Sequence, residues 1–211
     1  QADPEGGAVA WLAVHPHLAA HELGELPADG EAEPRAAMPA RHGTVHLGEG
    51  VEQALPGRFV DADATMALET LRNSAFSAFL VGQQAARLMR ENVPDANGAK
   101  GTIIFPNASA ALKGFPTSGA FAMACQAKSG LAQSMARELM PQGIHVANVP
   151  IDAAIGWTQE DGTRAHRLAG TAADDNMADP DSIAETYLQL HRQHRSTWAF
   201  EVVLRPWVEK W

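Results

Sequence analysis

The stretch KSGLAQSMARELMPQGIHV, residues 128–146, says more about the fold than any other part of the chain. Small and apolar side chains at helical spacing predict a helix over residues 119–140, which the turn residues PQG at 141–143 close. The apolar run IHVANV, residues 144–149, then predicts a fully buried strand. A helix that leads through a tight turn into a buried strand is typical of a layered α/β domain with a parallel sheet.

The segments before this stretch continue the alternation of helices and buried strands. The β-branched run GTIIF at 101–105, ended by Pro106, predicts a second buried strand. Residues 61–93 carry apolar side chains at helical spacing, and Asp63 or Thr65 is the candidate N-cap. A long helix is therefore expected ahead of the first of these two strands.

The segments after it complete the pattern. Residues 179–194, DPDSIAETYLQLHRQH, open on an Asp-Pro signal and predict a helix. WAFEVVL at 198–204 predicts a last strand, before the tail RPWVEKW at 205–211.

The N-terminal part of the chain is less regular. Residues 1–62 hold much of the Pro, Gly and acidic content, and residues 21–43 carry turn signals that predict mostly loop. AVAWLAV at 8–14 and TVHL at 44–47 are the strand candidates there. We expect a single domain over 1–211, with a shortened, irregular N-terminal half and a regular core over 63–206.

The amino-acid composition argues against several classes of binding partner and suggests a location. The 211 residues carry a formal net charge of −9 and a pI of about 5.4, which argues against a nucleic acid or an anionic membrane as partner, because both need clustered Lys and Arg. Cys125 is the only cysteine, so no internal disulfide is possible and a cytoplasmic location is expected. No apolar run approaches the roughly 18 residues that a membrane span needs.

The spacing K-x-x-L-x-x-x-x-x-x-E-L-x-x-x-G-I-x-V, with GTIIFPNASAALKG ahead of it, resembles the short-chain dehydrogenase/reductase family over residues 61–206. The resemblance implies a Rossmann-like, doubly wound parallel sheet. It also implies a nicotinamide cofactor, NAD(P), across the carboxyl ends of the strands, and hydride transfer beside a tyrosine that acts as general acid or base. A lysine lowers the pKa of that tyrosine and holds the ribose, while a serine and a helix asparagine assist.

Three residues of this chain match that set. Lys128 in QAKSGL matches the lysine and is the residue expected to touch the cofactor. Asn73 in TLRNSAF matches the helix asparagine, and Ser109 in NASAAL matches the serine, although the alignment also allows Ala108 there. The plain alternatives are a solvated lysine, a helix-surface amide and a hydroxyl that caps a turn.

The tyrosine itself is missing. Four positions before Lys128 the chain has Ala124, and counting forward from the preceding strand gives Phe121; neither has a hydroxyl. The only tyrosine, Tyr187, lies in the late helix, where we expect it to pack. Cys125 is next to the vacant position, but a free cysteine in an Ala-rich helix is usually a small buried apolar residue.

The cofactor motif also departs from the family pattern. That pattern has a glycine-rich turn after the first strand, yet no glycine follows residues 8–14 until Gly24. TVHLGEG at 44–50 keeps glycines but loses the amides of the motif expected after the fourth strand. Ile151 and Asp152 replace the usual proline-glycine pair after IHVANV.

Two further sequence patterns do not alter this functional interpretation. His17 and His21 share a helical spacing but have no partner at a diagnostic distance, so no metal site is expected. The two tryptophans of the tail at 205–211 suit either a partner subunit or the chain's own core.

The sequence therefore favours a short-chain dehydrogenase/reductase-like protein that has lost catalysis, binds no cofactor and serves as a structural or regulatory subunit. It would form a homodimer, or a heteromer with an active paralogue, through the helices at 64–91 and 119–140. The alternative is an active NAD(P)-dependent oxidoreductase on a small carbonyl or alcohol, with a rearranged site around Lys128, Asn73 and Ser109. A non-redox enzyme that uses the same cleft and a small-molecule binding module also stay open.

Overall fold

The computed structural model describes residues 58–166, 170–171 and 175–209. Its centre is a pair of parallel strands, β1 (Gly101–Ala108) and β2 (Ile144–Ile151), joined by the helix α4 (Gly119–Leu139). The strands run in register from Gly101 opposite Ile144 to Ala108 opposite Ile151. The helix, the turn and the strand predicted from residues 128–146 are confirmed, and β2 is buried along its whole length.

A third extended segment continues the sheet beside β2. Residues 200–204 run parallel to β2 through bridges at Asn148–Glu201 and Ile151–Leu204. The Val202 N–H donates to the Asn148 carbonyl at 3.1 Å, and the Leu204 N–H donates to the Pro150 carbonyl at 2.9 Å. The strand predicted over 198–204 is therefore in the expected place and direction, but it forms isolated bridges instead of a regular strand.

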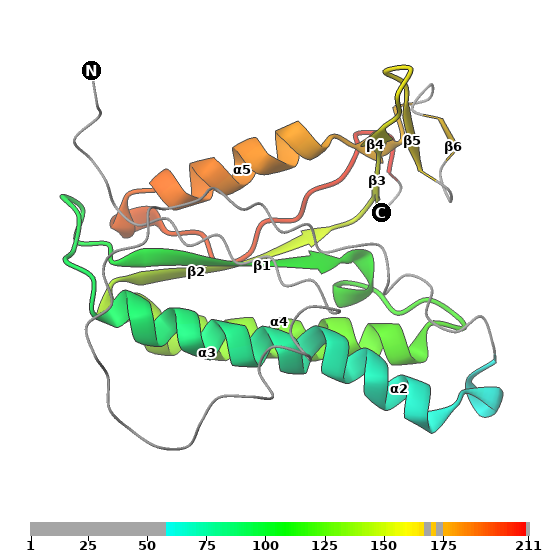
Figure 1. The fold of residues 1–211 in the computed structure, drawn as a ribbon, viewed down its shortest axis with the longest axis horizontal. Helices are drawn as coiled ribbons and strands as arrows, with labels where there is room; N and C mark the ends of the chain where they lie inside the picture. Colours follow the sequence, from blue (N-terminus) through cyan, green and yellow to red (C-terminus); the bar gives the residue numbers. More distant parts are fainter. Residues whose placement is uncertain (1–57, 167–169, 172–174, 210–211) are drawn as a thin grey trace.

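The sheet lies between two layers of helices (Figure 1), as expected for a doubly wound α/β domain. On one side are α4 and the helices α2 (Ala64–Leu71) and α3 (Ser77–Arg90); on the other is α5 (Pro180–Arg192). The strand candidates at 8–14 and 44–47 lie outside the described residues.

The first long helix is not a uniform α-helix, which corrects the prediction over 61–93. A π-helical segment (Arg72–Phe76) separates α2 from α3. Asp63, not Thr65, is the N-cap: its carboxylate accepts the N–H groups of Thr65 at 2.7 Å and Met66 at 3.0 Å. These hydrogen bonds lower the pKa of Asp63.

Strand β1 continues beyond Pro106, where the sequence predicted its end. Pro106 is opposite Val149, and two more residues follow it in the strand. Proline lacks only a donor and is accepted on edge strands. Among the described residues, β1 is the edge of the sheet.

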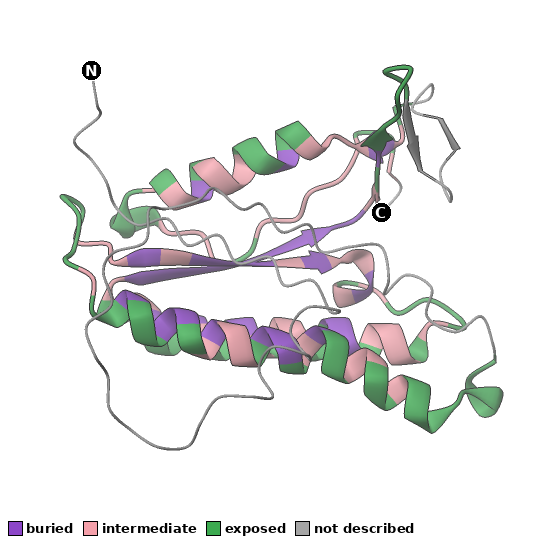
Figure 2. Ribbon diagram, viewed as in Figure 1, coloured by how far each residue is buried: buried purple, intermediate pink, exposed green. Residues whose placement is uncertain are grey.

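Two apolar cores hold the layers together (Figure 2). The core against α3 and α4 contains many alanines, which allow helix and sheet to approach closely; it includes Ala78, Ala85, Ala132, Ala136, Ile103 and Val146. The core against α5 contains Ile104, Ala147, Val149 and Leu190, with Tyr187 packed on it. The expectation that Tyr187 packs is confirmed.

Two small sheets follow β2 at its carboxyl end. In one, β3 (Ala154–Ile155) pairs with β7 (Met177–Ala178); in the other, β4 (Trp157–Thr158), β5 (Arg164–His166) and β6 (Gly170–Thr171) are antiparallel. Within the described part of the chain, no helix is both long and apolar enough to span a membrane.

Candidate functional site

The candidate site lies where β1 and β2 end. Parallel strands bring their carboxyl ends to one edge, which is where doubly wound domains bind ligands. Ala108 ends β1 and Ile151 ends β2, directly opposite each other. Helix α4 packs on both strands and carries Ala124, Cys125 and Lys128.

Lys128 is half-buried on α4 and has an altered protonation equilibrium. Burial lowers the pKa of its ammonium group, while the Cys125 thiol, one helical turn earlier, acts in the opposite direction. Within the described residues, the structure gives this ammonium neither a hydrogen-bond acceptor nor a carboxylate. The lysine that the resemblance implies is therefore present but isolated.

The neighbouring positions on α4 provide no phenol. Ala124 is 0% exposed, and its methyl group fills the place one turn before Lys128. Phe121, the other candidate position, is partly buried on the same helix. Cys125 is buried, and burial raises the pKa of its thiol above its ordinary value. A buried, protonated thiol agrees with the interpretation of Cys125 as a small core residue.

The other two matched residues are not joined to Lys128 by any hydrogen bond that the structure describes. Asn73 lies in the π-helical segment with its side chain exposed. Ser109 begins a 3-10 turn after β1, where its carbonyl accepts the N–H groups of Leu112 at 2.9 Å and Lys113 at 3.0 Å. Their catalytic roles stay predictions.

A buried polar network lies beneath the site, and sequence analysis did not identify it. Asn107 on β1 donates through Nδ2 to the Cys125 carbonyl at 3.1 Å and to Ser129 Oγ at 3.0 Å. Asn148 on β2 donates to Glu201 Oε2 at 2.9 Å. The signal was an asparagine in each of two mostly apolar strands, because a buried amide needs hydrogen-bond partners.

A cluster of charges closes the carboxyl edge of the sheet. Asp152, the residue after β2, is buried and lies 3.1 Å from Lys113 Nζ and 3.6 Å from Arg205 Nη2. Lys113 also lies 3.4 Å from Glu209 Oε1, and its hydrogen bond with Asp152 raises its pKa. Asp152, noted in the sequence only as a departure from the family pattern, thus ties together the segments that follow all three extended strands.

The C-terminal tail folds back onto this edge. The Lys113–Glu209 ion pair holds it, and Trp207 Nε1 donates to Asp175 Oδ2 at 2.8 Å. The indole of Trp207 is nevertheless 81% exposed.

Two kinds of bound group bear on this site: a metal ion and the nicotinamide cofactor. No group of three or more His, Cys, Asp or Glu side chains in the described ranges is arranged to hold a metal, and His17 and His21 lie outside those ranges. For the cofactor, Lys128 is in place, but the buried methyl of Ala124 replaces the phenol. The Asp152 N–H, at the proline-glycine position, is already donated to the Leu204 carbonyl at 2.7 Å. Of the residues that the resemblance places at the nicotinamide end of the cofactor, the described part of the chain therefore supplies the lysine without the phenol.

Comparisons with known proteins agree with the fold. A family model described as enoyl-(acyl carrier protein) reductase matches residues 41–200. A short-chain dehydrogenase from Rhodopseudomonas palustris is 31% identical, with a TM-score of 0.53, over 72% of this chain and 57% of its own. A 3-hydroxyacyl-CoA dehydrogenase type-2 from Mycobacterium avium is 20% identical, with a TM-score of 0.62, over 75% and 62%. A 4-hydroxyisoleucine dehydrogenase complexed with NADH and succinate is 16% identical, with a TM-score of 0.55, over 72% and 62%.

No curated protein matches the chain. The chain spans between 57% and 62% of the length of these three solved structures. The family model nonetheless covers most of the chain, including the helix of Lys128 and both parallel strands. The chain belongs to the short-chain dehydrogenase/reductase family.

Proposed function

We propose that this chain is a catalytically silent member of its family and serves as a subunit of an oligomer. One observation carries the proposal: the fully buried methyl group of Ala124 occupies the position one turn before Lys128. Hydride transfer to a carbonyl needs an acid that delivers a proton to the oxygen in the same step. Without a phenol beside it, Lys128 has no acid whose pKa it could lower.

Cys125 does not replace that acid. Its thiol is buried, and burial raises its pKa away from the range of a useful general acid. Asn73, which is exposed, and Ser109, which begins a 3-10 turn, offer no ionisable group. The free, buried thiol also suits a reducing cytoplasm, which is part of the proposal.

The absence of cofactor binding is part of the same proposal. It is supported by the donor set at the strand ends, where Asp152 is engaged with Lys113 and Arg205. Calorimetric titration with NADH and NADPH should give no binding at millimolar nucleotide, and the protein should not oxidise or reduce small alcohols or carbonyls. Turnover that survives purification and disappears in Lys128→Ala would contradict it.

An active NAD(P)-dependent oxidoreductase is the second candidate. The retained Lys128 favours it, as does the similarity to a dehydrogenase complexed with NADH. The same titration separates the two functions: micromolar binding of either nucleotide would support the active enzyme.

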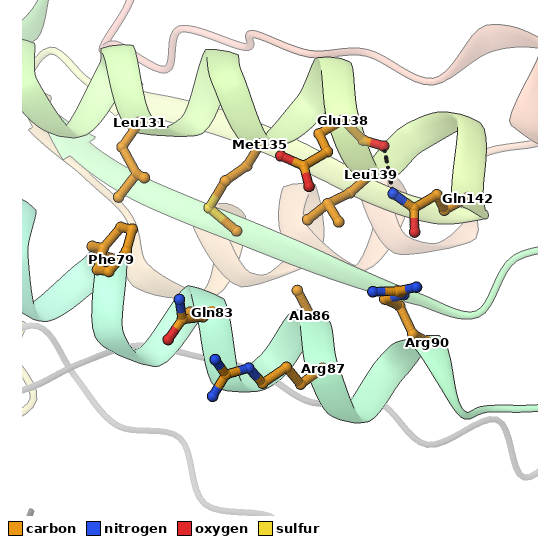
Figure 3. Close-up of a pocket in the computed structure, with 10 residues that line it drawn as sticks. All are labelled: Phe79, Gln83, Ala86, Arg87, Arg90, Leu131, Met135, Glu138, Leu139 and Gln142. Carbon is orange, nitrogen blue, oxygen red and sulfur yellow. Dashed lines mark hydrogen bonds between the residues drawn. The ribbon is translucent and has the colours of Figure 1, made fainter.

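The surface proposed for assembly is a groove between α3 and α4 (Figure 3). It measures about 280 Å³ and has an apolar floor that includes Phe79, Leu131 and Met135. Phe79 is 42% exposed and stacks on Phe76, which is 55% exposed, with ring centroids 6.4 Å apart. Neighbouring exposed aromatic rings are typical of protein interfaces.

The charges along this groove suit a second copy of the chain as its occupant. Arg87 and Arg90 lie on α3, while Glu138 lies on α4 across the groove (Figure 3). A two-fold axis makes every contact reciprocal, so a dimer in which the α3 arginines of one copy face Glu138 of the other contains this pairing twice. We therefore propose a homodimer through this groove, with a paralogue in place of the second copy as the other outcome.

Charge reversal tests this arrangement. The wild-type protein should sediment as a dimer at micromolar concentration, while Arg87→Glu and Glu138→Arg should each sediment as monomers. An equimolar mixture of the two variants should dimerise again, because both interface ion pairs are then restored. Arg192→Glu, a reversal on the exposed side of α5, is the matched control and should stay dimeric. A monomeric wild-type protein, or a mixture that stays monomeric, would contradict the homodimer.

A further inference from the structure

The C-terminal segment 205–209 is anchored at its beginning by buried contacts. It follows Leu204, which lies opposite Ile151 at the carboxyl end of β2. Arg205 Nη2 lies 3.6 Å from the carboxylate of Asp152, and the two side chains are 15% and 6% exposed. The segment therefore starts from a fixed point at the carboxyl edge of the sheet, where doubly wound domains bind their ligands (Figure 1).

The rest of the segment is held by two contacts at the surface. Glu209 Oε1 lies 3.4 Å from Lys113 Nζ, and both side chains are 36% exposed. Trp207 donates its indole N–H to Asp175 at 2.8 Å, although Trp207 is 81% exposed. Exposed ion pairs are individually weak, and salt screens them. The outer part of the segment is therefore held much less firmly than its beginning.

Both loops that receive these surface contacts hold a residue in a left-handed backbone conformation. Thr117, in the loop that follows Lys113, has φ 64°, and Asp175 itself has φ 57°. They are the two non-glycine residues with a positive φ in the described part of the chain. Thr117 is the more strained, because it is β-branched, whereas aspartate visits this region more readily. It is the third residue of a turn in which the Ser118 N–H donates to the Phe115 carbonyl at 3.2 Å, a position where a positive φ usually requires glycine.

Backbone strain of this kind persists only where the surrounding contacts hold it. For the loop of Thr117, these contacts pass through Lys113. The Lys113 ammonium lies 5.5 Å from the centre of the Phe115 ring in the same loop, 3.1 Å from Asp152 and 3.4 Å from Glu209. Lys113 thus connects the strained loop to the end of β2 and to the C-terminal segment, so separation of Glu209 removes one of the contacts that hold the loop.

We propose that residues 206–209 form a strap that closes over the carboxyl edge of the sheet, with Arg205 as its hinge. In the closed state, Glu209 and Trp207 hold the strap, and the loop of Lys113 keeps Thr117 strained. In the open state, both surface contacts are broken, Thr117 relaxes to a negative φ, and the Asp152 carboxylate becomes accessible to solvent and to ligands. Rising ionic strength favours the open state, because it weakens the outer ion pair more than the buried one.

Zero-length cross-linking of the whole chain measures how often the strap is closed. A water-soluble carbodiimide joins Lys113 to either Asp152 or Glu209 as an amide, and peptide mass spectrometry gives the ratio of the two products. Raising NaCl from about 0.1 M to about 1 M shortens the Debye length from about 10 Å to about 3 Å. We expect the Glu209 product to fall at least about threefold relative to the Asp152 product, while the far-UV circular dichroism stays unchanged. A ratio that does not change with salt would overturn the proposal.

Thr117→Gly tests whether the strain and the strap are coupled. Glycine adopts a positive φ without the steric cost of a Cβ, which should raise the ratio of closed to open strap about fivefold or more. The Glu209 product should therefore persist to higher NaCl concentration than in the wild type. Gly114→Ala, in the same loop, is the matched control and should follow the wild type, because a Cβ there meets nothing within 4 Å. A wild-type salt dependence in Thr117→Gly would show that the strap and the strained loop are not coupled, and would overturn the proposal.

Carboxyl labelling tests whether the strap covers the edge of the sheet. With glycinamide as an added amine, the same carbodiimide labels the carboxylates that the reagents reach. Glu209→Gln removes the outer ion pair, so Asp152 should be labelled at least about threefold faster than in the wild type. The exposed Glu185 on α5 should react at the same rate in both proteins. Equal rates at Asp152 would overturn the proposal. Neither measurement involves a nucleotide or turnover, so the strap is tested independently of the proposed function.

Discussion

Replacing Gly143 with alanine should weaken the connection on which the whole fold depends. Gly143 lies between α4 and β2 and has φ +89°, a left-handed conformation that costs a residue with a Cβ about 1–2 kcal/mol. A Cβ at this position would lie 2.9 Å from the carbonyl oxygen of Gly98, closer than real Cβ atoms come.

That neighbour cannot easily move away. Gly98 belongs to a turn in which the Asp95 carboxylate accepts the N–H groups of Asn97 and Ala99, each at 2.8 Å. The Lys100 N–H, just beyond, donates to the Gly143 carbonyl at 2.7 Å. Together, conformational strain and overpacking should lower the free energy of unfolding by about 2–4 kcal/mol.

Gly130→Ala is the matched control for this change. Gly130 lies in α4 with an ordinary helical conformation, and a Cβ there meets nothing within 4 Å. This variant should gain about 0.5–1 kcal/mol, because alanine is the better helix former. Urea denaturation followed by far-UV circular dichroism measures both variants. If Gly143→Ala were as stable as the wild type, the argument from backbone conformation and contact would be refuted.

Three further substitutions test the site and the core. In Ala124→Tyr, the added ring enters a fully buried position, so we expect a loss of about 1–3 kcal/mol and no gain of NADH oxidation; a stable variant with turnover would contradict the proposed function. Asn148→Ala removes the hydrogen bond to Glu201 at 2.9 Å and disturbs the network around Asn107, which should cost about 1–3 kcal/mol in urea denaturation; a neutral result would mean that water takes its place. Burial lowers the pKa of His145 below its ordinary value of 6.5, despite carbonyl oxygens at 2.9 and 3.1 Å from its ring nitrogens. The unfolded chain then binds the proton first, so stability should fall as the pH drops through about 6.5. His145→Gln should flatten this fall between pH 7.5 and 5.5, and an unchanged slope would assign it to other groups.

Local sequence patterns were sufficient to predict most of the helices and strands. The small residues of α4 and the turn at Gly143 depend on neighbours a few positions away, and so does the Asp179 cap of α5, which accepts the Ser182 N–H at 2.9 Å. The π-helical segment was not predictable in this way. Its hydrogen bonds span five residues instead of four, a difference that apolar periodicity over a single turn cannot resolve.

The contacts among the charged and polar groups of the site could not be predicted from local sequence patterns. Asp152 is 39 positions from Lys113, and Asn148 is 53 positions from Glu201, yet each pair is in contact. No periodicity carries information about partners at such separations. They meet because the parallel strands end at one edge and the last segment returns beside β2.

The sequence by itself determined the α/β fold, the family and the presence of Lys128 without a tyrosine, because these depend on residue identity and short spacing. Only the tertiary structure decided what surrounds that lysine. Burial lowers its pKa, and the carboxylates at this edge of the sheet hold Lys113 instead. The protonation and hydrogen bonding of a side chain depend on the atoms packed around it, and folding brings those atoms from distant parts of the chain.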